Sequence, residues 1–172
     1  MYESVGNIGV PDWVFTEFGH PVEKRNFRYA EMLYPNRELH DHWTTGGSVP
    51  DMSKREARMY FFYRSCRYID SGFEAIHFGQ VELMDHKDPN HRNWMDLLTR
   101  VRHYAGLHAR RRMVLCDAHT HGIVVNGHLL FDFHAYPLMA RDVRSSPQKT
   151  VLETGYFSSI YGLTEGGITP SG

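Results

Sequence analysis

Acidic and histidine side chains gather near the ends of two segments that read as β-strands. Asp117 and His119 are two residues apart, so an extended chain places them on one face, and His121 joins them if the strand continues. Asp132 and His134 repeat this spacing in a later segment. Because carboxylates and imidazoles exchange protons with substrates near neutral pH, the spacing predicts a site for acid–base chemistry.

Two earlier segments also end on carboxylates. Residues 74–84 read as a strand covered on both faces, and Gln80 and Glu82 share a face near its end. Residues 12–18 are rich in aromatic and β-branched side chains and read as a shorter strand, with Glu17 at the matching position. We therefore expect four strand ends to bring acidic groups into one pocket.

A pair of carboxylates is the minimum equipment for glycoside hydrolysis. One carboxyl group protonates the leaving oxygen, while the other acts as nucleophile or as base on water. We predict Glu82 as the proton donor and Asp132 or Asp117 as its partner, with Glu17 as a further candidate. The alternative for each of them is a structural role, as a helix cap or in an ion pair with an arginine.

The neighbouring polar and aromatic side chains are candidates for substrate binding. Gln80, His119, His121 and His134 lie on the same strand faces as the acids. Trp43 lies in a long irregular loop, and aromatic residues make up 13% of the chain. Because a sugar ring can stack its C–H face on an aromatic ring, Trp43 is the best candidate for a platform that binds a carbohydrate substrate.

The stretch Asp117-Ala-His119-Thr-His121 resembles the Asp-x-His-x-His segment of the amidohydrolase superfamily, whose two histidines bind a divalent metal. Neutral imidazoles on one strand face can converge on Zn²⁺, which would acidify a bound water. A metal-dependent hydrolase that uses His119 and His121 is therefore one alternative to a glycosidase without a cofactor, and a non-catalytic carbohydrate-binding barrel is the other. If no metal binds, these histidines are expected to hydrogen-bond the substrate or neighbouring carboxylates.

Helices are predicted between the strands that carry these groups. Ser53 and Glu56 have the spacing of a capping box, so a helix should run from there to about residue 69. Gly72 suits the left-handed residue that follows a helix. Apolar residues at helical spacing predict a second helix over residues 91–108, and Asn126-Gly127 predicts the turn of a β-hairpin.

The order strand, helix, strand, helix, strand, with a third strand over 113–119, is typical of a parallel sheet. It predicts an α/β fold, a partial or complete TIM-type (β/α) barrel with its chemistry at the C-terminal strand ends. His77 has the opposite parity from Gln80 and Glu82, so it should pack toward a helix. A closed barrel usually needs more than the 172 residues present, so we expect one domain over 1–172 that is truncated at its C-terminus.

Composition argues against several other classes of protein. Lys and Arg number 19 and Asp and Glu 20, so no basic excess indicates a nucleic-acid partner. No signal peptide or membrane-spanning run is visible, and we expect a soluble protein without a membrane partner. The two cysteines, Cys66 and Cys116, read as buried free thiols, which leave the compartment open. The sequence predicts neither the oligomeric state nor the substrate linkage.

Three segments together resemble uncharacterised bacterial proteins that look like TIM-barrel glycoside hydrolases. They are residues 68–84, residues 115–122 and residues 129–134, and the resemblance spans about residues 50–140. It implies a barrel, carbohydrate substrates and carboxylates at strand ends. It assigns no role to an individual residue, and the Asn-Glu pair common in retaining barrel glycosidases is replaced here by Gln80-Val81-Glu82.

Overall fold

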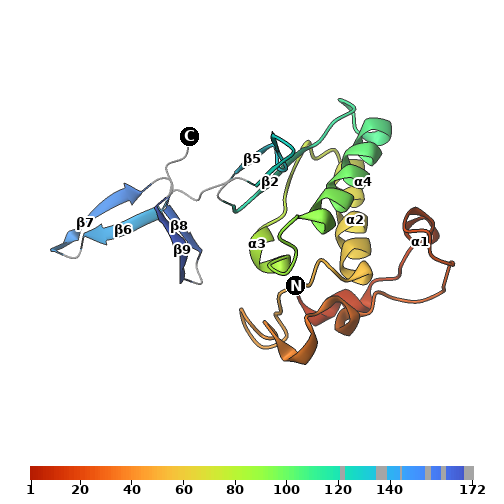
Figure 1. Ribbon diagram of the computed structural model, residues 1–172, viewed down its shortest axis with the longest axis horizontal. Coiled ribbons are helices and arrows are strands. Elements are labelled where there is room, and N and C mark those ends of the chain that lie inside the picture. Colours follow the sequence, from red (N-terminus) through yellow and green to blue (C-terminus); the bar gives the residue numbers. More distant parts are fainter. Residues whose placement is uncertain (121–122, 135–138, 144, 154–155, 160–161, 169–172) are drawn as a thin grey trace.

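The computed structural model describes residues 1–120, 123–134, 139–143, 145–153, 156–159 and 162–168 (Figure 1). The N-terminal part is largely irregular and contains one short α-helix and three 3₁₀ turns. These are η1 (Glu3–Asn7), α1 (Asp12–Glu17), η2 (Tyr29–Met32) and η3 (Pro35–Arg37). Val14 and Phe15 of α1 are fully buried, so this short helix anchors the loops on the core.

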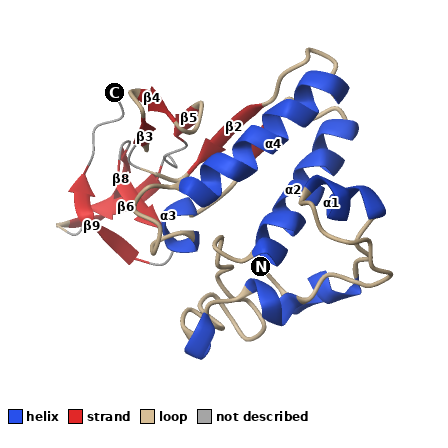
Figure 2. Ribbon diagram, turned by 45° about the vertical axis from the view of Figure 1, so that its right-hand side comes forward, coloured by secondary structure: helices blue, strands red, loops and turns tan. Residues whose placement is uncertain are grey.

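Two long helices and a small sheet form the centre of the molecule. The elements are α2 (Arg55–Asp70), β1 (Ala75–His77), α3 (Val81–Met84), α4 (Arg92–His108), β2 (Leu115–Ala118) and β5 (Phe133–His134). The three strands are parallel in the order β1-β2-β5, and α4 lies along the sheet beside α2 (Figure 2). Parallel neighbours need a crossover, which α3 and α4 supply between β1 and β2.

Three antiparallel strand pairs lie outside the parallel sheet in the described chain. The short hairpin joins β3 (Val124–Val125) to β4 (His128–Leu129). Further along, β6 (Met139–Val143) pairs with β7 (Ser146–Glu153), and β8 (Tyr156–Ser159) pairs with β9 (Gly162–Ile168). Each of these pairs is a separate two-stranded sheet.

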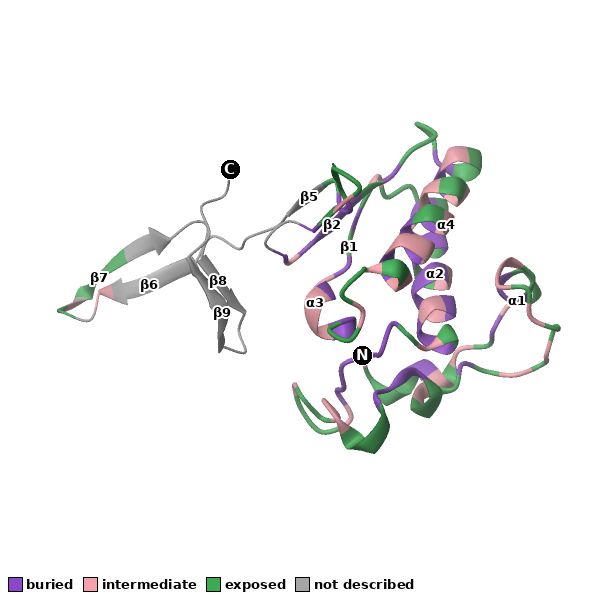
Figure 3. Cartoon of the chain, in the orientation of Figure 1, coloured by how far each residue is buried: buried purple, intermediate pink, exposed green. Residues whose placement is uncertain are grey.

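The core lies between the inner faces of α2 and α4 and one face of the parallel sheet (Figure 3). Trp94, Leu97, Leu98, Val101 and Ala105 of α4 are fully buried, as their helical spacing predicted. The indole N–H of Trp94 donates to the carbonyl of Val81 at 3.1 Å, which ties α4 to α3. The segment that follows β1 is therefore held against the longer helix.

The predicted TIM-type barrel is wrong. The described residues form four α-helices, one three-stranded parallel sheet and three two-stranded antiparallel sheets, which is a small mixed α/β fold. Residues 12–18 are helical rather than extended, because burial of Val14 and Phe15 on one side of a helix outweighs their strand propensity. Residues 74–84 divide into β1 and α3, because Gly79 has a positive φ of 78° that ends the extended run.

Several local predictions are confirmed. The helices predicted to about residue 69 and over 91–108 are α2 and α4, and Gly72 has a φ of 88°. Asn126 and Gly127 both have positive φ in the turn between β3 and β4. The capping box is wrong, since no side chain caps α2 and Glu56 binds Arg25 instead.

Cys66 and Cys116 are buried and free, as expected. In the part of the chain that the structure describes, no helix combines the length and the apolar character needed to cross a lipid bilayer.

Candidate functional site

The C-terminal ends of β1 and β2 bring a histidine and an aspartate together. His77 and Asp117 occupy the same register position on neighbouring parallel strands, so their side chains share a face of the sheet. His77 Nδ1 lies 2.9 Å from Asp117 Oδ2. The Asp117 side chain is only 9% exposed, whereas that of His77 is 42% exposed. The pair therefore has a buried acidic end and an accessible imidazole.

This contact fixes the protonation pattern of the neutral imidazole. An ionised carboxylate accepts hydrogen bonds and cannot donate one, so His77 carries its proton on Nδ1 when the pair is formed. The other ring nitrogen, Nε2, then has a free lone pair. A half-exposed imidazole oriented in this way is equipped to take a proton from water or from a substrate hydroxyl.

Backbone hydrogen bonds continue the pairing past the end of β1. The amide of Phe78 donates to the carbonyl of Asp117 at 2.9 Å, and the amide of His119 donates to the carbonyl of Gly79 at 2.9 Å. The loops that follow β1 and β2 are therefore held side by side. A Cβ added at Gly79 would have nothing within 4 Å, so the positive φ, rather than crowding, is the reason a glycine suits this place.

His119 adds a second imidazole to the site. Its ring centroid lies 4.5 Å from that of His77. Burial lowers the pKa of His119, the nearby His77 lowers it further, and the Asp117 carboxylate opposes both effects. The lowered pKa favours the neutral ring of His119, which can donate one hydrogen bond and accept another.

Glu82 lies on α3, beside the same strand ends. The hydroxyl of Thr120, which is fully buried, donates to Glu82 Oε1 at 2.7 Å. Gln80 precedes α3, and its Oε1 atom is buried without a hydrogen-bond partner among the described residues. The segment after β1 therefore presents an oriented carboxylate and an unsatisfied amide oxygen. Glu82 and Gln80 lie past the end of the strand, however, on a helix and at its start, and not within the strand as expected.

Two predicted acids lie in structural ion pairs. Glu17 is in α1 and not at a strand end, and Arg100 Nη1 donates to it at 2.8 Å. Asp132 precedes β5, where it accepts from the amide of Cys116 at 2.7 Å and from Arg102 at 3.2 Å. Each carboxylate has a cationic partner, which is the alternative that the sequence left open for these acids.

The remaining predicted site residues divide into two groups. Trp43 packs against the core from the N-terminal loops, with its ring 5.7 Å from that of His42. His134 is the last residue of β5, paired in register with Ala118, and its side chain is not described. His121 lies outside the described residues. The structure brings together Asp117, His119, Glu82 and Gln80 of the predicted set.

The sequence reading missed His77. We expected it to face a helix because its parity was counted back from Gln80 and Glu82. The count fails because the strand ends at His77 and Gly79 turns the chain. A glycine in an apolar run signals a break in the alternation, so the parity of His77 should not have been counted across Gly79.

The metal-binding prediction finds no support in the side chains that the structure describes. Those residues contain no group of three or more His, Cys, Asp or Glu side chains arranged to hold a metal ion. Asp117 faces His77 instead, and His121 belongs to the undescribed pair 121–122. The donor set for Zn²⁺ is therefore incomplete in the described part of the site.

Comparison with known proteins places the chain in no established group. No family model matches it, and neither a curated protein nor a solved structure does so. The fold and the site by themselves define a small mixed α/β protein with a histidine–aspartate pair at the C-terminal edge of a parallel sheet.

Proposed function

We propose that this chain carries the acid–base centre of a hydrolase that acts on carbohydrate. His77 transfers the proton, Asp117 orients the imidazole ring of His77, and Glu82 is the second acidic group. The observation that carries the proposal is the 2.9 Å contact between a half-exposed imidazole and a buried carboxylate. A carboxylate that holds the far nitrogen of an imidazole is a recurring device of general base catalysis.

The roles of the acids differ from those expected of a glycosidase with two free carboxylates. Asp117 is engaged by His77, so it acts through the imidazole and not directly on substrate. Glu82 accepts from Thr120 at 2.7 Å, which fixes its orientation. The carbohydrate part of the proposal is supported by the sequence resemblance and by the aromatic content of 13%.

The test is turnover of a panel of 4-nitrophenyl glycosides, with 4-nitrophenyl acetate to detect ester hydrolysis. We expect His77→Gln and Asp117→Asn to lower kcat/KM by about 10²-fold or more, and Glu82→Gln to do the same. His103→Gln is the matched control, because His103 is an exposed histidine on α4. Turnover by His77→Gln equal to that of the wild type would remove His77 from the mechanism.

The same panel separates catalysis from binding. If calorimetry shows that a sugar binds but the protein does not hydrolyse it, the chain would be a carbohydrate-binding protein and not a hydrolase. Hydrolysis of the acetate alone, with the same dependence on His77, would keep the acid–base centre and overturn the carbohydrate assignment.

A further inference from the structure

We propose that Asp85 is a pH-sensitive switch that controls how α3 presents Glu82 at the candidate site. While the carboxyl group of Asp85 is neutral, α3 holds the position seen in the structure, and ionisation of this group releases the helix end. Asp85 directly follows Met84, the last residue of α3, so it adjoins the helix that carries Glu82. The consequence for catalysis rests on the proposed function, whereas the switch itself is a property of the fold.

The carboxyl group of Asp85 is buried and has few partners for a charged group. The residue is 5% exposed. Its Oδ1 atom accepts a hydrogen bond from the side-chain amide of Asn93 at 2.8 Å, and its Oδ2 atom is buried without a hydrogen-bond partner among the described residues. A carboxylate that leaves water in this way loses much of its hydration without replacement, whereas a neutral carboxyl group loses far less. The described geometry therefore favours the neutral form.

Carboxylates lie around Asp85 on more than one element. Asp88 follows it in the loop before α4, and Asp51 belongs to the segment before α2, where it is itself 5% exposed. Both act on Asp85 electrostatically, and Asp85 in turn acts on the hydroxyl of Tyr34 from the N-terminal loops. His86, the next residue along the chain, is exposed, and its ring centroid lies 4.8 Å from that of Tyr34. Ionised Asp85 therefore adds a negative charge to a region that already holds two.

Arg58 of α2 supplies a positive charge that acts on Asp85, but other groups already engage it. Its Nη1 atom donates to the carbonyl of Met52 at 2.6 Å and to Asn93 Oδ1 at 2.8 Å, and its Nε atom lies 3.4 Å from Asp96 Oδ2. Among the described residues, Arg58 is linked to Asp85 through the amide of Asn93, without a direct hydrogen bond. Burial outweighs the opposing effects and raises the pKa of Asp85 to about 7.

The segment that contains Asp51 also holds the end of α3. The amide of Met52 donates to the carbonyl of Met84 at 2.8 Å. Met52 directly follows Asp51, so repulsion between Asp51 and an ionised Asp85 acts across the hydrogen bond that joins the two segments. Because α3 has four residues, and a single turn of helix is unstable without tertiary contacts, loss of this hydrogen bond releases the helix end.

The effect reaches Glu82 through the short helix. Trp94 donates to the carbonyl of Val81 at 3.1 Å, so the start of α3 stays on the core when the other end is released. Glu82 is the next residue, and its Oε1 atom accepts from the hydroxyl of Thr120 at 2.7 Å. Release of the helix end turns Glu82 away and breaks this hydrogen bond. We therefore expect an oriented Glu82 below about pH 7 and its loss as the pH rises through that value.

The test is an NMR pH titration of the protein without substrate, between about pH 5 and about pH 9. The carboxyl carbon of Asp85 reports its ionisation, and the amides of Met52, Met84 and Thr120 report the position of α3. We expect these amides to shift with the same midpoint as the Asp85 carboxyl group, near pH 7. Turnover is not measured, so failure of the proposed hydrolase activity would leave this result standing.

Two variants make the result specific. In Asp85→Asn, which is neutral at every pH, the steps of the Met52 and Met84 amides near pH 7 should disappear. In Asp88→Asn, we expect the midpoint to move to lower pH, because a negative charge that opposes ionisation of Asp85 is gone. Asp12→Asn is the matched control, since the side chain of Asp12 is 59% exposed, and it should leave the midpoint unchanged.

A midpoint for the Asp85 carboxyl group below about pH 5 would overturn the switch, as would amides of α3 that do not follow its ionisation. Steps at Met52 and Met84 that persist in Asp85→Asn would overturn it as well. Thermal denaturation shows whether each variant is folded. If Asp85→Asn does not fold, the wild-type titration and the direction of the shift in Asp88→Asn decide the question.

Discussion

His77 Nδ1 and Asp117 Oδ2 lie 2.9 Å apart on neighbouring parallel strands, and the ring of His119 packs against that of His77. Burial and His77 lower the pKa of His119, and Asp117 opposes them. We expect His119 to titrate below its ordinary value of 6.5. Its pKa should fall further in Asp117→Asn, which loses the opposing negative charge, and rise in His77→Gln.

These changes are measured by following the imidazole C–H resonances in an NMR pH titration. The exposed His103 on α4 serves as an internal control. A pKa of His119 that rises in Asp117→Asn would contradict the described arrangement of the three side chains.

Asp85 makes the stability of the fold depend on pH. Burial raises its pKa from 3.8 to about 7, with further contributions from Asp88 and Asp51, while Asn93 and Arg58 oppose the rise. The folded chain therefore holds this proton more tightly than the unfolded chain. The resulting stabilisation is complete below pH 3.8 and is lost as the pH rises to about 7.

We expect Asp85→Asn to remove this loss. Between pH 5 and pH 8, its free energy of unfolding should rise relative to that of the wild type by at least about 1 kcal/mol. Urea denaturation at the two pH values measures the difference. Asp12→Asn is the control, because the side chain of Asp12 is 59% exposed. A difference that does not change with pH would show that Asp85 titrates normally.

The helices could be predicted from the sequence because their apolar spacing is regular over many residues. The buried residues Trp94, Leu97 and Val101 of α4 repeat at the helical period, so only a helix places all three on one buried face. The turn at Asn126-Gly127 was also readable, because few residue pairs tolerate two positive φ angles. Both signals are local, and neither depends on distant parts of the chain.

The end of β1 and the ion-pair partners of two predicted acids could not be predicted in the same way. β1 has only three residues, too few for alternation to show where it ends. Asp117 lies in a strand, as its local pattern indicated. The other two acids bind arginines that are remote in sequence: Glu17 binds Arg100, and Asp132 binds Arg102. Such pairings depend on how the helices pack, which no local pattern encodes.

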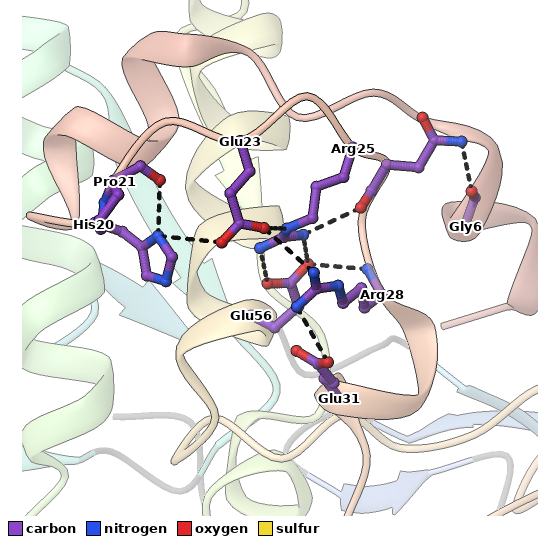
Figure 4. Close-up of polar contacts among 9 residues, drawn as sticks. Gly6, His20, Pro21, Glu23, Arg25, Arg28, Glu31 and Glu56 are labelled. Carbon is purple, nitrogen blue, oxygen red and sulfur yellow. Dashed lines mark hydrogen bonds and ion pairs between the residues drawn. The ribbon is translucent and has the colours of Figure 1, made fainter.

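The ion pair of Arg25 and Glu56 holds the N-terminal loops on α2. The carboxylate is 6% exposed and the guanidinium 13% exposed, and hydrogen bonding to Glu56 raises the pKa of Arg25. We expect Glu56→Gln to lower the free energy of unfolding by about 2 kcal/mol, because the largely buried guanidinium of Arg25 then keeps only Glu23 as an ionic partner (Figure 4). Urea denaturation at pH 7 measures the change.

The matched control is Glu31→Gln, which breaks the exposed pair with Arg28. We expect it to cost about 0.5 kcal/mol or less, since both side chains lie in water. Equal losses in the two variants would mean that the Arg25–Glu56 pair contributes no more than a surface contact.

Replacing two surface glycines by alanine should change the stability of the protein in opposite directions. Gly72 follows α2 with a φ of 88°, and Gly106 lies within α4; a Cβ at either position has nothing within 4 Å. We expect Gly72→Ala to destabilise the protein by about 1 kcal/mol and Gly106→Ala to stabilise it by about 0.5–1 kcal/mol. Thermal denaturation distinguishes the two, and a shift of the same sign in both would contradict the backbone argument.

The pairing of β1 with β2 also bears on the order in which the chain folds. His77 and Asp117 are separated by 40 residues, and the intervening segment contains all of α4. Closing so long a loop for a three-residue strand pair is unfavourable until the helices have already docked. We expect amides of α2 and α4 to gain protection before those of β1 in pulse-labelled hydrogen exchange, so the site assembles only on a scaffold that has already formed.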